Sequence, residues 1–135
     1  MRYMLLIYSN EKVAEARSPE ETQRVRAGHM TVMEETGRLG ILRGAEPLEP
    51  TRTATTVRHD NGKVLITDGP FAETKEQLAG YYILECKDLD EALEWAARIP
   101  TACQGGAGCV EIRPIRTMGK PQDSSSTPVH QTVNG

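Results

Sequence analysis

The stretch "YMLLIY", residues 3–8, decides how this chain folds. Successive side chains of a β-strand point to opposite faces of its sheet, so the six residues divide into two sets. Both sets are apolar: Tyr3, Leu5 and Ile7 form one, and Met4, Leu6 and Tyr8 form the other. This pattern predicts a central strand that is covered on both faces.

A helix is predicted to follow this strand. In Ser18-Pro19-Glu20-Glu21 the serine can cap the first turn, proline fits the first helical position and Glu21 can complete a capping box. The helix should begin at Pro19 and end near Thr36 or Gly37, with the glycine as its left-handed cap. His29 lies on the apolar stripe of this helix, so we expect it to face the sheet or its margin.

A β-hairpin is predicted in the middle of the chain. Asp60-Asn61-Gly62 separates two runs, residues 53–58 and 63–67, that are rich in β-branched side chains. Asparagine and glycine both tolerate the positive φ of a tight hairpin turn, so the pair is a strong hairpin signal.

The second half of the chain repeats the pattern of strand, helix and strand. Residues 80–86 and 110–115 read as strands, with a capped helix from about residue 88 to just before Pro100. Trp95 falls off the apolar stripe of that helix, which fits either an interface edge or half-buried packing.

The resulting order predicts an α+β fold, a ferredoxin-like split βαβ sandwich with an inserted β-hairpin. The domain should span residues 1–116. Residues 117–135 are polar and rich in serine, proline and glycine, and they are expected to form a disordered C-terminal tail.

Two helices can cover only one face of a sheet, whereas the strands at residues 3–8 and 81–84 are apolar on both. The simplest cover for the second face is another copy of the chain, which predicts a homodimer of the α+β barrel type.

The amino-acid composition argues against several classes of function. The 135 residues are 38% hydrophobic, enough for one core, and the net charge of -3 argues against a nucleic-acid partner. The apolar run at residues 3–8 is too short for a membrane span. Three cysteines without a CxxC motif support neither a disulfide framework nor a zinc site, so we expect a cytoplasmic protein with no metal and no cofactor.

The stretch "VLITDGPFAETKEQL", residues 64–78, resembles the DGPF signature of the YCII-related family. Residues 4–8, 54–58, 87–92 and 99–100 also fit, so the resemblance extends from Met1 to about Ile115. It implies a ferredoxin-like fold that dimerises as an α+β barrel. For function it implies less, because most members have none assigned; one YCII-like branch includes a dehydrochlorinase that acts on a chlorinated hydroxyquinol.

The resemblance also implies a histidine and an aspartate as the active site, which carry over to His29 and Asp68. As a pair they would suit a cofactor-free lyase, with the carboxylate orienting a histidine that acts as general base. Tyr8, Phe71 and Tyr82 are candidate ligand-binding residues. A plain structural alternative is a satisfied helix histidine and an aspartate that caps its own turn.

A second functional hypothesis is a non-catalytic metabolite-binding or regulatory dimer. The DGPF branch is often associated with extracytoplasmic-function sigma factors, which fits a regulatory context. A hydrogen-bonded pair of His29 and Asp68 in a reachable pocket would favour the enzyme, whereas a pocket without the pair would favour binding.

Overall fold

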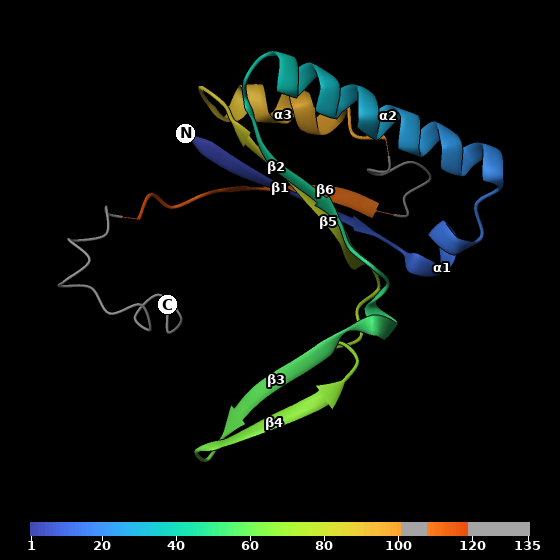
Figure 1. Ribbon diagram of the computed structural model, residues 1–135, viewed down its shortest axis with the longest axis vertical. Helices are drawn as coiled ribbons and strands as arrows, with labels where there is room; N and C mark the ends of the chain where they lie inside the picture. Colours follow the sequence, from blue (N-terminus) through green and yellow to red (C-terminus); the bar gives the residue numbers. More distant parts are fainter. Residues whose placement is uncertain (101–107, 119–135) are drawn as a thin grey trace.

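The structure is a computed structural model, and it describes residues 1–100 and 108–118. Figure 1 shows two helices packed on one face of a sheet and a hairpin extending away from that body. In chain order the elements are β1 (Arg2–Ser9), α1 (Glu11–Glu15), α2 (Pro19–Arg38), β2 (Leu42–Pro47), the short 3-10 helix η1 (Thr51–Thr53), β3 (Thr55–Asp60), β4 (Lys63–Asp68), β5 (Gln77–Glu85), α3 (Leu89–Ala97) and β6 (Gly108–Pro114).

The predicted α+β class is confirmed. The larger sheet is antiparallel with the strand order β2-β5-β1-β6, and β3 pairs with β4 in a separate two-stranded sheet. β1 is an interior strand, as its two apolar faces predicted, with Leu5 opposite Tyr82 of β5 and Ile112 of β6. This register places Tyr82 on the same face of the sheet as Leu5.

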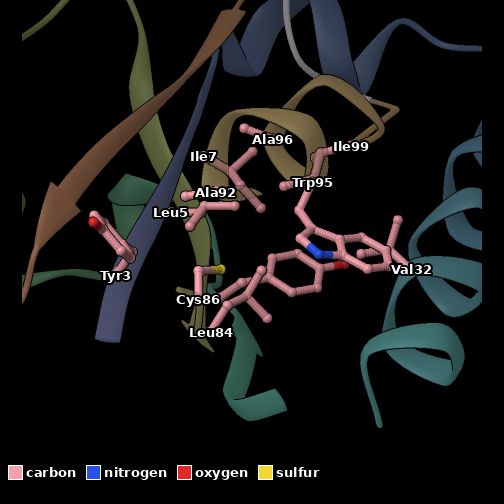
Figure 2. Close-up of a cluster of buried hydrophobic side chains, with 11 residues drawn as sticks. Tyr3, Leu5, Ile7, Val32, Leu84, Cys86, Ala92, Trp95, Ala96 and Ile99 are labelled. Atoms are coloured by element: carbon pink, nitrogen blue, oxygen red, sulfur yellow. The ribbon is translucent and has the colours of Figure 1, made fainter. Parts of the chain in front are cut away.

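The core lies between this face and the two long helices. Leu5 and Leu84 of the sheet are fully buried, and Val32 of α2 belongs to the same buried cluster. Figure 2 shows the indole of Trp95 reaching from α3 toward Val32. Trp95 is 8% exposed and carries the Arg98 guanidinium 4.7 Å from its ring centre, so it is a core residue rather than an interface edge.

α2 begins where its cap predicted and ends later than expected. The Ser18 hydroxyl accepts the Glu21 N–H at 3.1 Å, and Pro19 is the first helical residue. Gly37 lies inside the helix, so the prediction that it is the left-handed cap is wrong. Gly40 takes that role with φ of +75°, and the Ile41 N–H closes the end by donating to the Thr36 carbonyl at 3.0 Å.

The predicted hairpin is confirmed. Asn61 and Gly62 have φ of +50° and +78°, as a tight turn between β3 and β4 requires. Apolar side chains of β4 remain open to solvent; Ile66 is 70% exposed and Val64 is 57% exposed. Among the described strands, β3 and β4 pair only with each other, so the hairpin is an arm outside the core.

Two short helical segments were not predicted. The Asn10 side chain caps α1 by accepting the N–H groups of Lys12 and Val13. Glu11 then joins α1 to η1, because its carboxylate accepts both the N–H and the hydroxyl of Thr51 at 2.7 Å. The expected C-terminal tail lies almost wholly outside the described residues.

The helix-free face of the larger sheet carries a second apolar set. Met4, Leu6 and Ile83 keep intermediate exposure, because α2 and α3 both pack on the opposite face (Figure 1). Tyr8 shares the helix-free face with Glu111 of β6, and the Tyr8 hydroxyl donates a hydrogen bond to the Glu111 carboxylate. Burial and the negative charge of Glu111 raise the pKa of Tyr8.

Substituting Gly80 should separate β2 from β5. A Cβ atom there would lie 2.7 Å from the Glu46 carbonyl oxygen and 3.2 Å from the Pro47 Cα, both backbone atoms. We expect Gly80→Ala to lower the free energy of unfolding by about 1–3 kcal/mol in a urea titration followed by circular dichroism. Gly44→Ala is the matched control, since its Cβ would meet the Ile83 side chain at an ordinary 3.6 Å. Equal stability of the two variants would contradict the expectation.

Candidate functional site: a pocket beside His29

A cavity of about 490 Å³ lies between α2 and the helix-facing side of β1, β2 and β5, with α1 at one end. Much of its wall is apolar, built from Ile7, Ala14, Val25, Met30, Met33, Ala45, Pro47 and Ala79. Its polar lining residues are Ser9, Arg17, Thr22, Arg26, His29, Glu46, Tyr81 and Tyr82. Of these, Glu46 and Tyr81 are paired opposite each other, and their side chains point to the helix-free face of the sheet. The volume and this composition are typical of a site for a small molecule.

His29 and Tyr82 form the polar centre of the wall. His29 reaches the sheet because it continues the stripe of α2 that buries Val32. Tyr82 points to the helix side of the sheet because it lies two residues before the buried Leu84 on β5 and therefore shares its face. The His29 Nδ1 lies 2.7 Å from the Tyr82 hydroxyl oxygen, and the two rings stack with centres 5.9 Å apart.

Both groups are neutral at physiological pH. Burial lowers the pKa of His29 below its ordinary value of 6.5, and the positive charge of Arg17 lowers it further. Burial raises the pKa of Tyr82 to about 12. The Tyr82 hydroxyl also lies 3.4 Å from the backbone carbonyl oxygen of His29, to which it can donate a hydrogen bond.

Arg17 enters the lining from the short loop between α1 and α2. Its side chain is half-buried, and no hydrogen bond or ion pair joins it to another residue within the described part of the chain. Arg26 lies in the lining as well, one turn before His29 on α2. Neither arginine was predicted from the sequence, although Thr22, Arg26, His29 and Met33 follow helical spacing and could have marked this face.

Of the five predicted site residues, His29 and Tyr82 line the cavity and touch each other. The other three lie outside the lining. Asp68 is the exposed last residue of β4, Phe71 is 72% exposed in the loop that follows, and Tyr8 is on the helix-free face. Within residues 1–100 and 108–118, no hydrogen bond joins His29 to Asp68.

Other kinds of site find little support in the described residues. They contain no group of three or more histidine, cysteine or acidic side chains that could hold a metal ion. Burial raises the pKa of the Cys86 thiol to about 11, so it is not a ready nucleophile. None of the described helices is both long and apolar enough to cross a membrane.

The fold and cavity define a small α+β protein with a single-histidine pocket, and comparison with known proteins gives its family. The model of the YCII-related domain matches residues 1–119, so the chain belongs to the YCII-related family. It is 42% identical over 115 residues to the uncharacterized protein R00369 of Rhizobium meliloti (strain 1021), which covers 85% of this chain and 92% of that protein.

The lowered pKa of His29 predicts a pH-dependent stability. Because the pKa is lower in the folded protein than in the unfolded chain, the unfolded chain takes up its proton first as the pH falls below about 6.5. The contribution of neutral His29 to the free energy of unfolding is therefore fully present above that pH, and it is lost on acidification.

Urea titrations at about pH 7.5 and about pH 5.5 check this expectation. The wild type should lose more stability between the two values than His29→Gln does. His59→Gln, on the exposed strand β3, is the control and should follow the wild type. Identical losses in wild type and His29→Gln would contradict the expectation.

Proposed function

We propose that this protein binds a small, largely apolar molecule in the pocket and that His29 acts there as the general base of a cofactor-free, lyase-type reaction. The observation that carries the proposal is the 2.7 Å contact between His29 Nδ1 and the Tyr82 hydroxyl in the wall of the 490 Å³ cavity. A half-buried histidine that is neutral and held in one orientation is the residue type best suited to accept a proton near pH 7.

The hydrogen-bond geometry suggests which ring nitrogen is the base. If Nδ1–H donates to the Tyr82 oxygen, the tyrosine hydroxyl can donate in turn to the His29 carbonyl, and both hydrogens are used. Nε2 then has a free lone pair. Tyr82 would thus be a positioning residue, in the role that a carboxylate often has beside a catalytic histidine.

In a lyase-type step Nε2 of His29 would take a proton from the substrate. The electron pair of the broken bond would form a new double bond, and the leaving group would depart with the electrons of its own bond. The apolar wall supports this chemistry because it limits the access of water to the reacting atoms. A small hydroxylated ring that carries chloride as leaving group fits this scheme.

The role of Asp68 stays a proposal. In the described chain its carboxylate is on the arm and not in the pocket wall, so any contact with His29 would need a rearrangement or a second copy of the chain. Phe71 and Tyr8 likewise would contact ligand only through such an assembly. The sequence of residues 68–71 supports placing the chain in the DGPF branch of the family.

Binding without catalysis is the second candidate. It is favoured by one observation, that the pocket contains His29 without a carboxylate hydrogen-bonded to it in the described structure. The same cavity would then sense a metabolite, in a regulatory context such as that of extracytoplasmic-function sigma factors. Ligand binding with no turnover would be its signature.

We also propose that the sheet order β2-β5-β1-β6, with both long helices on one face, is a ferredoxin-like arrangement with the hairpin inserted before β5. A homodimer of α+β barrel type would cover the helix-free face, where Met4, Leu6 and Ile83 are only partly buried. A cytoplasmic location completes the proposal.

A substrate screen tests the enzyme. Small chlorinated and hydroxylated ring compounds are incubated with the protein, and chloride release is measured. His29→Gln should abolish release, whereas Tyr82→Phe should lower kcat by about tenfold to a hundredfold because the ring loses its orienting partner. His59→Gln should leave the rate unchanged. Turnover that survives His29→Gln would contradict the catalytic proposal, and binding without turnover would favour the second candidate.

Light scattering during size-exclusion chromatography tests the dimer. The wild type should elute with twice the mass of one chain. Ile83→Glu should give single chains, because it places a charge on the helix-free face that the second copy would bury. Leu93→Glu, on the exposed side of α3, is the matched control and should remain dimeric. A wild type of single-chain mass would overturn the dimer.

A further inference from the structure

We propose that the ligand of this pocket carries a carboxylate, which Arg17 binds at one end of the cavity while an apolar ring or branched chain occupies the space beside His29. This inference rests on the pocket of the proposed function and deepens it by naming the substrate class, a small apolar acid.

The state of Arg17 is the first observation. Its guanidinium has five N–H donors, yet none makes a hydrogen bond within the described residues. Two more exposed arginines have carboxylate partners: Arg52 binds Glu15 at 2.9 Å with 72% of its side chain exposed, and Arg98 pairs with Glu35. A half-buried guanidinium that lines a cavity without a partner is positioned to bind an anion from outside the chain.

The charge of the lining is the second observation. The lining includes Arg17, Arg26 and one acidic residue, Glu46. The register directs the Glu46 side chain to the helix-free face, together with Tyr81 and Leu6. The pocket is therefore net positive in a chain whose formal net charge is -3. This local reversal of sign favours an anionic ligand over a neutral or cationic one of the same shape.

The shape of the cavity is the third observation. The rest of the wall includes Val25, Met30, Met33 and Ala45, whose side chains offer no hydrogen bonds. An aromatic or branched apolar group would bury its surface there, with the carboxylate held at the cationic end. The fit defines an amphipathic acid rather than a sugar, a nucleotide or a polyamine.

The same contact links binding to the chemistry of His29. Arg17 lowers the pKa of the imidazole through its positive charge. A carboxylate that neutralises Arg17 removes this influence, so binding would raise the pKa of His29 and strengthen it as a base. The other charged residues of the lining are Arg26 and Glu46, and Tyr82 remains neutral.

The test compares benzoate with benzamide, which has the same shape without the charge. Each is titrated into ¹⁵N-labelled full-length protein, and the amide signals of Ala45, Ala79 and Gly80 report pocket binding. The wild type should bind benzoate about tenfold more tightly than benzamide, a difference of about 1.4 kcal/mol. Arg17→Gln should lose this preference by weakening benzoate alone. Arg24→Gln, an exposed arginine of α2 outside the lining, should retain it.

The pKa of His29, followed through its ring ¹⁵N signals, gives an independent readout. It should rise when benzoate saturates the wild type, remain constant with benzamide, and be higher in ligand-free Arg17→Gln than in the ligand-free wild type. Circular dichroism of each variant confirms folding, and Arg17→Lys, which keeps the charge without the planar fork, should retain part of the preference.

Three outcomes would overturn the proposal: equal affinity of the wild type for benzoate and benzamide, no binding of benzoate to the pocket, or an unchanged preference in Arg17→Gln. His29→Gln separates this proposal from the catalytic one, because it should keep the preference for benzoate. Turnover that requires His29 together with a failed benzoate test would leave the proposed reaction standing and remove only the carboxylate.

Discussion

The pairing of β1 with strands on both of its sides is the constraint on which the rest of the structure depends. β1 is hydrogen-bonded to β5 along one edge and to β6 along the other. The register of these pairings determines the side of the sheet to which each residue points. Leu5 and Tyr82 therefore share a face. A shift of one residue would turn Tyr82 away from α2 and would separate it from His29.

The pocket exists because α2 does not contact the sheet equally along its length. The buried residues of the helix, Val32 and Thr36, both lie in its second half. Close to the middle, Gly28 approaches Pro100 so closely that a Cβ would be 2.7 Å from the proline Cγ. The helix lines the cavity from Thr22 to Met33, on its first half and its middle. His29 lies at the transition between these two regions, which explains why it is half-buried and still reachable by a ligand.

Features that depend on neighbours in sequence were predictable. The serine cap of α2, the turn at Asn61 and Gly62, and the alternation of β1 are each determined by a few adjacent residues. The stripe of α2 also predicted that His29 faces the sheet. The partner of His29 could not be predicted, because the choice between Tyr82 and Asp68 depends on how a helix and distant strands align in space.

The same limit explains the other misses. Arg17 lies in a loop without periodicity, so no pattern indicated that it would line a pocket. Gly37 and Gly40 are both chemically suited to end a helix, and only the geometry of the chain that follows selects Gly40. Trp95 lies off the stripe that its own helix defines, yet the neighbouring α2 offers a surface that buries it.

The separate pairing of β3 with β4 has a consequence for evolution. Because the arm contributes no side chain to the cluster around Leu5, its sequence and length can change with little effect on the central body. Residues 64–68 of the DGPF-like stretch lie on this arm, so packing of the core does not account for their sequence. The arm can thus make contacts of its own while the cavity stays intact.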